Sequence, residues 1–257
     1  MRAAGTAVAA LALASVLAGT FPARAADAGT ALAAARRRVE SADYRLIGRM
    51  VRVDANGART SENVNILARW FPGTLRILLK IDSPAAARAH VLLEMRPDGK
   101  STILIAHPGD AAPAELPFSA WTQGPMGAAF SYEDFMEAQY FWPGQKYLGE
   151  AKYGARTCGR LLSTPGAADR THYASVESWL DPGSGFPVYS EKKLKGAPDV
   201  KQFTYFGLRQ TRGVWWASQV EARIRGRAGS TLLIVERGSP EAHLGLKDFD
   251  PARLTKF

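Results

Sequence analysis

The sequence is poor in cysteine, with only Cys158 among its 257 residues. One cysteine cannot form a disulfide within the chain, so the hydrophobic core must hold the fold. Cys158 is either a reactive thiol or a small buried residue in a strand, and we expect the second. The four histidines are scattered, and none forms a cluster with cysteine. The sequence therefore predicts no metal site and no cofactor.

Catalytic motifs are absent as well. No serine lies in a nucleophile-elbow pattern, and no glycine-rich loop leads into a helix with a Lys-Ser/Thr pair. Glu133 and Asp134 are adjacent acids, but both fall at a predicted helix N-terminus, where they complement the helix dipole. Because a catalytic triad assembles in space, a hydrolase of lipid or polysaccharide stays open, and inward-facing Glu94 or Glu177 would favour it. We expect a protein that is not an enzyme.

The chain has no apolar run long enough for a comfortable membrane span. A short basic start at Arg2 precedes the apolar stretch 7–18, and Ala23-Arg24-Ala25 has the small-x-small form of a cleavage site. These features predict a secretory signal peptide over residues 1–25 that is removed before Ala26. The alternative is an N-terminal membrane anchor that is never cut. No cysteine follows the cleavage site directly, so we expect no lipid anchor.

Positive charge predominates. The formal net charge is +9, and removal of Arg2 and Arg24 with the signal peptide leaves +7. A basic exported protein meets anionic lipid headgroups or acidic partners more often than nucleic acid, although the charge can also serve solubility alone. No internal repeat and no low-complexity linker is present, and the length suits a single all-β domain over residues 26–257.

Short apolar runs separated by Gly, Pro, Asn and Asp turns predict a sheet of neighbouring antiparallel strands. Leu75, Ile77 and Leu79 alternate with Arg76 and Lys80, so one face of the sheet is expected to be apolar. An Ala- and Arg-rich helix over Ala31–Ser41, after Thr30 as N-cap, precedes them. The expected strands are Tyr44–Val53, Glu62–Phe71, Leu75–Ile81, Val91–Arg96, Thr102–His107, Tyr147–Ala151, Arg156–Ser163, His172–Leu180, Pro187–Leu194, Val200–Leu208, Val214–Arg225 and Ser230–Arg237.

The proline-rich segment His107–Ala129 interrupts this rhythm and is either a functional cover or an exposed connector. Next, Ser131 and Asp134 fit a capping box, and Phe130 and Phe135 have the spacing of a hydrophobic staple. A short helix that ends near Gln139 is therefore expected. Because it is so aromatic, it must press on the apolar sheet face or cover something lodged there.

Adjacent aromatics occur at Tyr205-Phe206 and at Trp215-Trp216, both in predicted strands. Neighbouring strand residues point to opposite faces, so one of each pair is expected in the core and the other outside. A stacking platform for nucleic acid is conceivable at such a place, but export argues against it. The tail over 241–257 is expected to be anchored by Phe249 and Leu254.

These motifs, in this order, resemble the outer-membrane lipoprotein-sorting proteins, relatives of the periplasmic lipoprotein carrier LolA. Members carry Gly-Ser-Asp where this chain has Gly127-Ala128-Ala129, and basic residues where it has Phe118-Ser119-Ala120, so the region is more apolar here. The matching motifs are Asp43-Tyr44-Arg45, Gly48-Arg49, Trp70, Arg76-Ile77-Leu78-Leu79-Lys80-Ile81, Pro84, Leu116-Pro117, Phe130-Ser131-Tyr132-Glu133-Asp134-Phe135, Tyr173, Trp179-Leu180-Asp181, Lys201 and Thr231.

The resemblance implies a mostly β fold: a strongly curved antiparallel sheet forming an incomplete barrel, with helices lidding its concave apolar face. It implies a periplasmic, non-enzymatic carrier of acylated lipoprotein or lipid, loaded by an inner-membrane transporter, unloaded at an outer-membrane acceptor and in transient contact with membrane surfaces. The alternative is an RseB-like regulatory binding protein of the envelope-stress response, although such proteins carry a further C-terminal domain.

An acyl chain needs an apolar cavity in water, because each exposed methylene costs about 0.8 kcal/mol and a chain of roughly sixteen carbons therefore needs on the order of 10 kcal/mol of shelter. Each candidate is equally compatible with ordinary core. The residues expected to line or lid the cavity are Val64, Ile66, Trp70, Ile77, Leu79, Leu93, Trp121, Met126, Phe130, Phe135 and Met136.

Overall fold

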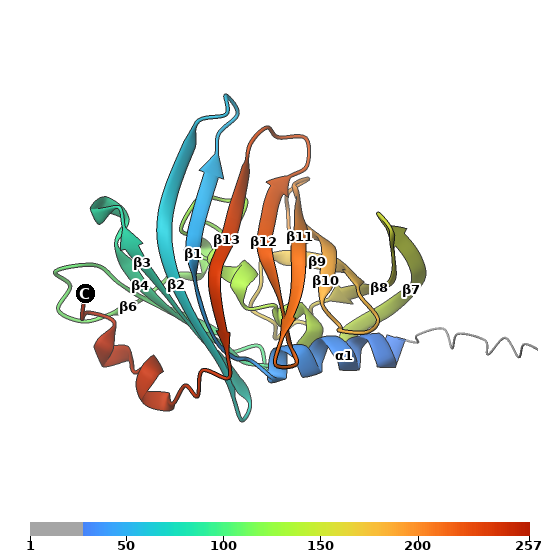
Figure 1. Cartoon of the computed structure of the whole chain (residues 1–257), viewed down its shortest axis with the longest axis horizontal. Coiled ribbons are helices and arrows are strands. Elements are labelled where there is room, and N and C mark those ends of the chain that lie inside the picture. The colour runs from blue at the N-terminus through green and yellow to red at the C-terminus, as the bar shows by residue number, and fades with distance from the viewer. Residues whose placement is uncertain (1–27) are drawn as a thin grey trace, which may run out of the picture.

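The computed structural model describes residues 28–257. The predicted signal peptide, its cleavage site and Ala26 lie outside the described residues. Within them the chain folds into one antiparallel sheet of thirteen strands in the order β6-β5-β4-β3-β2-β1-β13-β12-β11-β10-β9-β8-β7. The sheet curves strongly but does not close (Figure 1). The predicted fold class is confirmed.

The strands follow the predicted turns closely. A helix, α1 (Ala28–Glu40), comes first. The strands are β1 (Asp43–Val53), β2 (Arg59–Phe71), β3 (Thr74–Ser83), β4 (Ala89–Met95), β5 (Thr102–Ala106), β6 (Ala114–Glu115), β7 (Gly144–Tyr153), β8 (Arg156–Thr164), β9 (Tyr173–Leu180), β10 (Pro187–Leu194), β11 (Val200–Thr211), β12 (Val214–Ile224) and β13 (Ser230–Pro240). Short 3-10 turns are η1 (Ala85–Ala87), η2 (Phe118–Ala120), η3 (Tyr132–Phe135), η4 (Ala138–Phe141), η5 (Leu246–Phe249) and η6 (Pro251–Arg253).

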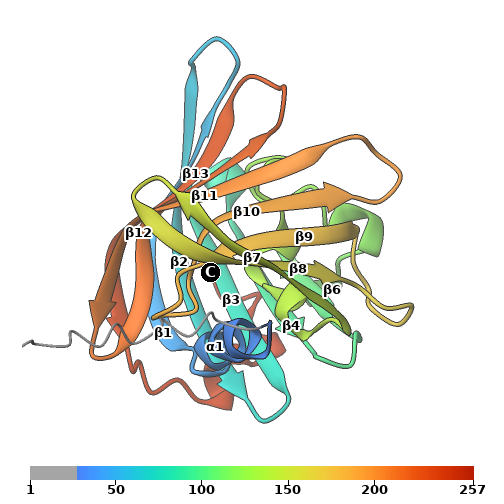
Figure 2. The same ribbon diagram turned by 90° about the vertical axis from the view of Figure 1, so that its right-hand side faces the viewer.

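Strands that are consecutive in the chain are neighbours in the sheet, except that β6 and β7 lie at its two opposite edges, and β13 returns to pair with β1. That ladder runs from Tyr44 opposite Pro240 to Val53 opposite Ser230. It joins the half of the sheet that contains β2–β6 to the half that contains β7–β12. The middle of the sheet is therefore built from the first and the last strand of the sequence. Figure 2 shows the two halves facing each other across the concave side, with α1 at the lower edge.

The concave side of β1–β5 carries the main core. Inward side chains of these strands pack against the proline-rich segment, whose Trp121 is fully buried and whose Met126 is 4% exposed. Trp121 Nε1 donates to the carbonyl oxygen of Leu116 at 3.1 Å, which fixes the indole within the segment. The segment 107–129 is therefore anchored on the sheet by Trp121 and Met126, and its role as a functional cover stays a prediction.

The convex side of β2–β5 is covered by the C-terminal tail. Leu244, Phe249 and Leu254 are buried there against outward leucines such as Leu78 and Leu92. The two predicted anchors, Phe249 and Leu254, are confirmed. Among the described residues no helix has the length and apolar character to cross a membrane.

Two helix predictions need correction. α1 begins at Ala28, so Thr30 lies within the helix and is not its N-cap. The helix expected from Ser131 is instead the pair of 3-10 turns η3 and η4, separated by Glu137 at a positive φ of 48°. The capping box of Ser131 with Asp134 is present, and the Phe130 and Phe135 rings lie 4.9 Å apart, so the start signals were correct. The helix ends early because Asp134 and Glu137 make ion pairs with residues of other elements.

Candidate functional site

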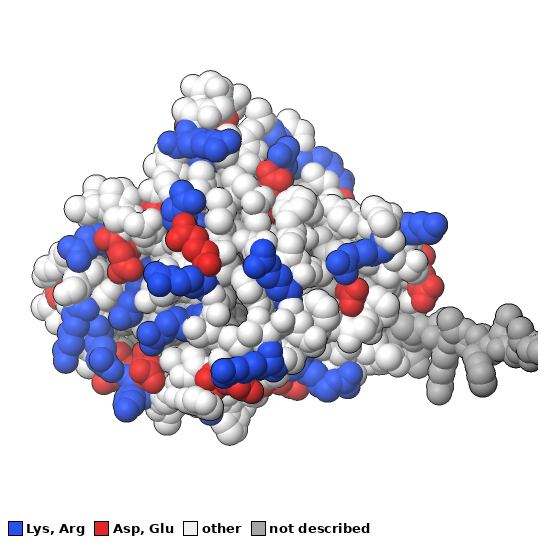
Figure 3. Space-filling model, viewed as in Figure 1, with Lys and Arg blue, Asp and Glu red and all other residues white. Residues whose placement is uncertain are grey.

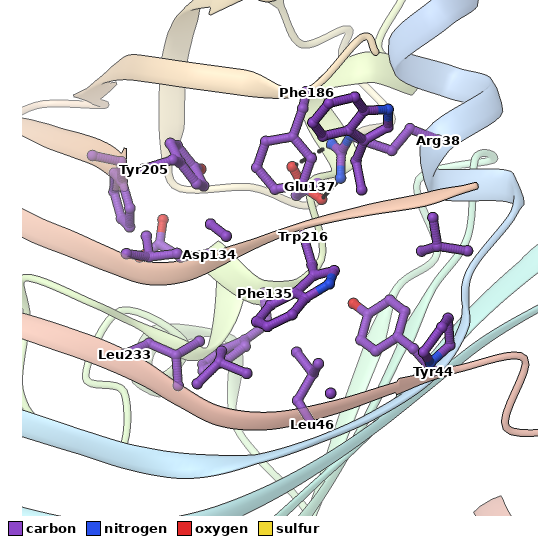
Figure 4. A pocket seen from close by; sticks show the side chains of 18 of the residues that line it. Arg38, Tyr44, Leu46, Asp134, Phe135, Glu137, Phe186, Tyr205, Trp216 and Leu233 are labelled. Carbon is purple, nitrogen blue, oxygen red and sulfur yellow. Dashed lines mark hydrogen bonds and ion pairs between the residues drawn. The ribbon is translucent and has the colours of Figure 1, made fainter. Parts of the chain in front are cut away.

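A cavity of about 140 Å³ lies on the concave side between α1, the η3–η4 turns and strands β11–β13 (Figure 4). Its wall is mainly aromatic and aliphatic, and its polar groups are few. Figure 4 shows Arg38 reaching from the helix to Glu137 above the hollow, with Tyr44 and Leu46 below it. The lining residues include Arg38, Leu46, Phe130, Asp134, Phe135, Glu137, Phe186, Tyr205, Trp216 and Leu233.

The cavity forms where β12 leaves β13. β12 pairs with β13 from Gln219 to Ala222, whereas β13 continues beside β1 as far as Pro240. The strands therefore fork beyond Gln219. Trp216 on one arm and Gly238 on the other both line the hollow. Gly238 leaves room there, because a Cβ on it would meet the Leu46 side chain at 3.2 Å.

The β11–β12 hairpin continues past its neighbours on both sides. β11 pairs with β10 only from Val200 to Thr204, and β12 pairs with β13 only from Gln219 onward. In the described ladders, residues 205–218 pair only within the β11–β12 hairpin, with Tyr205 opposite Val220 and Phe206 opposite Gln219. We call residues 205–218 the flap. A two-stranded ribbon is marginally stable alone, so we expect the flap to be the wall of the cavity that opens most readily.

Arg38 ties α1 to the turn between η3 and η4. Its Nη1 and Nη2 donate to the two Glu137 carboxylate oxygens at 3.0 and 2.6 Å. The guanidinium also lies 4.8 Å from the centre of the Phe186 ring. Burial opposes the charge on Arg38, but Glu137 outweighs it and raises the pKa of the guanidinium. This bidentate pair, which we call the latch, is a strong one because it is partly shielded from water.

A buried polar cluster holds η3 to the sheet. Lys192 Nζ donates to Oδ1 of Asp134 at 2.8 Å, and Lys201 Nζ donates to Oδ2 at 3.0 Å. The Tyr173 hydroxyl donates to Oδ1 at 2.6 Å, and the Ser131 backbone and hydroxyl each donate to Oδ2 at 2.7 Å. Burial alone would raise the pKa of Asp134, but the two lysines hold it well below its usual value. Burial raises the pKa of Tyr173.

Glu133 makes a second set of contacts beside this cluster. It accepts hydrogen bonds from the Thr171 hydroxyl and from the His172 backbone at 3.1 Å, and it lies 3.0 Å from His172 Nδ1. The adjacent acids were expected at the start of a helix as partners of its dipole. The structure instead buries both and pairs them with other elements. η3 is thus fixed to β9–β11 rather than free to swing.

The predicted cavity residues divide into three groups. Phe130 and Phe135 line the cavity. Trp70 is partly buried and stacks on Phe141 at 5.4 Å. The others lie in the packed core beneath the cover, and their contact with a ligand stays a prediction: Val64, Ile66, Ile77, Leu79, Leu93, Trp121, Met126 and Met136.

Sequence reasoning missed the cavity wall on β11–β13 and the two lysines. Leu233 alternates with Val235, and both were visible as inward positions of a strand. Lys192 and Lys201 stand opposite each other in register on β10 and β11, at positions otherwise buried. Lysine is almost never fully buried unless it is paired, so a lysine at an inward strand position could have predicted a buried acidic partner.

The two acids that would have favoured a hydrolase do not face the cavity. Glu94 alternates with inward Leu93 and pairs with Arg76 at 2.9 Å on the outer face. Glu177 pairs with Arg160 at 2.6 Å, also on the side away from buried Ser178. Among residues 28–257 no three His, Cys, Asp or Glu side chains gather as metal ligands. Cys158 is fully buried in β8, as expected, and burial raises the pKa of its thiol.

Comparisons with known proteins agree on the fold. A model of a family described as an uncharacterized protein matches residues 73–256. No curated protein sequence matches the chain. A domain of a putative outer membrane lipoprotein-sorting protein from Vibrio parahaemolyticus is similar in structure, with a TM-score of 0.78 and 18% identity over 90% of this chain and 100% of that one.

Two further solved structures are similar. A DUF1329 family protein from Desulfovibrio piger has a TM-score of 0.78 and 15% identity over 89% of this chain and 100% of that one. A LolA superfamily protein from Nitrosomonas europaea has a TM-score of 0.67 and 15% identity over 88% of this chain and 98% of that one.

Proposed function

We propose that this chain is a periplasmic acyl-chain carrier. It belongs to the family of uncharacterized proteins whose model matches it, and it has the fold of the LolA-like lipoprotein-sorting proteins. It binds the acyl chains of a lipoprotein or lipid in the cavity, without covalent chemistry, and shuttles them from the inner toward the outer membrane. The observation that carries the proposal is the aromatic cavity at the β12–β13 fork, closed by a ribbon without strand partners on its outer edges.

The size of the cavity indicates that this is a closed state. A cavity of about 150 Å³ lined by Leu, Ile and Phe takes up a molecule the size of benzene. The cavity here is about 140 Å³. An acyl chain of roughly sixteen carbons is larger, and sheltering it is worth on the order of 10 kcal/mol. The wall must therefore move to admit a whole chain.

The contacts around the cavity support a movement of the flap and of α1 relative to η3. η3 is held by the ion pairs of Asp134 with Lys192 and Lys201, so it stays on the sheet. Among residues 28–257 the flap makes only one ion pair to another part of the chain, the exposed pair of Arg212 with Glu241, and α1 is held to the turn by the latch of Arg38 and Glu137. Opening thus widens the β12–β13 fork and releases the latch, while η3 remains as the fixed floor.

Direction of transport then depends on partners that favour one state. A donor transporter in the inner membrane that binds the open protein promotes loading, and an outer-membrane acceptor that binds the open protein and takes up the cargo promotes release. Each partner shifts the equilibrium only by its difference in affinity for the two states. No energy source on this chain is required.

The test is purification from the periplasm without detergent, followed by native mass spectrometry and lipid extraction. A stoichiometric acylated species that co-purifies is the expected result and identifies the cargo class. An apo mass that takes up neither added lipid nor added lipopeptide would contradict the proposal. A matched pair of variants localises the cargo: Leu233→Asp, at the cavity wall, should lose it, and Leu246→Asp, 60% exposed on the tail, should keep it.

A further inference from the structure

The flap combines exposed aromatic surface with positive charge at the mouth of the cavity. Phe206 is 43% exposed, one of three large hydrophobic side chains so exposed among residues 28–257. Arg209 and Arg212 are exposed on the same ribbon, and residues 205–218 contain no acid. Figure 3 shows Lys and Arg intermixed with Asp and Glu over the face in view.

The exposed surface of the flap lies next to the cavity. Tyr205 and Trp216 of the same ribbon line the cavity, so the flap forms one side of the fork that leads to it. In Figures 1 and 2 the flap and α1 both lie at the lower end of the molecule. Arg37 on α1 is exposed there as well and adds a cation to that end.

We infer that the flap docks edge-on against the surface of an anionic bilayer, with Phe206 on one face of the ribbon in the headgroup region, and with Arg209 on the other face and Arg212 in the turn against lipid phosphates. Aromatic rings favour the membrane interface, and each arginine near an anionic surface contributes attraction that salt screens. This rests on the proposed function: with the fork held against the bilayer, an acyl chain moves between membrane and cavity without crossing water. Glu241 lies 3.6 Å from Arg212 in an exposed pair, which a phosphate can replace at little cost.

The charges can be tested with matched variants. Arg209→Gln with Arg212→Gln removes two cations from the flap, and Lys193→Gln with Lys195→Gln removes two exposed cations from the β10–β11 hairpin. The apo protein is floated with vesicles of phosphatidylethanolamine and phosphatidylglycerol, and with vesicles of phosphatidylcholine alone. We expect binding to the anionic vesicles, weakened at least about tenfold by the flap variant and little by the hairpin variant.

The ring is tested in the same way. Phe206→Ser should weaken vesicle binding, and Leu246→Ser, which changes a more exposed side chain on the tail, should not. Wild-type protein that floats with neither kind of vesicle overturns the inference, and so does equal binding by the flap and hairpin variants. That outcome would leave a protein partner as the occupant of this surface.

Acyl retention in solution is measured on the same preparations, so that the two proposals fail separately. Phe206 is not among the cavity-lining residues, and its variant should retain cargo while losing transfer to vesicles. Cargo-free protein that still binds anionic vesicles through the flap would contradict the carrier function and support the membrane surface. Protein that retains cargo but binds vesicles equally well without the flap side chains would support the carrier function and contradict the membrane-docking surface.

Discussion

At the scale of single residues, Asp134 is the centre of the buried polar cluster that holds η3 to the sheet. Its carboxylate separates two buried ammonium groups, Lys192 and Lys201, and accepts from Tyr173 and Ser131. Removing the charge leaves two buried cations without their anion. We predict that Asp134→Asn lowers the free energy of unfolding by ~3–5 kcal/mol, measured by urea denaturation. Asp82→Asn, at an exposed position on β3, should change it little.

The same residue sets the stability at acid pH. The pKa of Asp134 is depressed in the folded protein, so its stabilisation is complete above the unfolded value of about 3.9 and is lost as pH falls below it. Wild-type unfolding should therefore show a loss of stability below about pH 4 that Asp134→Asn lacks. Equal pH dependence in both proteins would mean that the cluster contributes nothing through this carboxylate.

Phe135 is the predicted cavity residue with the clearest test. It packs on Phe130 and lines the hollow. A carboxylate there would have to be desolvated with the ligand, which costs several kcal/mol. We predict that Phe135→Asp abolishes lipid retention in native mass spectrometry while circular dichroism shows a folded protein. Normal retention by a folded variant would remove η3 from the cavity wall.

At the scale of elements, the latch and the flap set how readily the cavity opens. Arg38→Gln breaks the bidentate pair with Glu137 and leaves the flap sequence intact. We predict that amide hydrogen exchange in residues 205–218 is faster than in the β1–β13 ladder, and faster still in Arg38→Gln. Cargo should dissociate sooner from the variant. An exchange rate for the flap equal to that of the central ladder would show that the ribbon is not the opening element.

The elements also show what sequence patterns reveal and where they fail. Alternation predicted the strands to within a few residues, because each has one buried face. The predicted and observed bounds of the strand Pro187–Leu194 are identical. The helix after Ser131 was wrong beyond its first turn. Local signals of capping and staple were correct, but the path after Phe135 is set by the ion pair of Glu137 with a residue 99 positions away. The cavity wall was missed for the same reason: a fork depends on where ladders stop, which no single strand encodes.

At the scale of the whole molecule, the C-terminal tail closes the convex side of the sheet. Leu254 is 3% exposed against the outer leucines of β2–β4, and its carbonyl oxygen lies 2.8 Å from His90 Nδ1. We predict that Leu254→Asp lowers the free energy of unfolding by about 2–5 kcal/mol, seen as a fall in Tm. Lys256→Asp, exposed two residues later, is the control. An unchanged Tm would mean that the tail adds nothing to the stability of the sheet.

The pairing of β1 with β13 has a consequence for how the chain reaches its native state. These strands form the middle of the sheet, and Arg49 bonds Glu236 across 187 positions of sequence. Until the last strand is available, β1 and β12 both present open edges, and the two halves of the sheet are not joined. Such distant contacts make folding slow. The centre of the sheet therefore forms only after the last strand has been synthesised, and assembly of the whole sheet waits for residues 230–240.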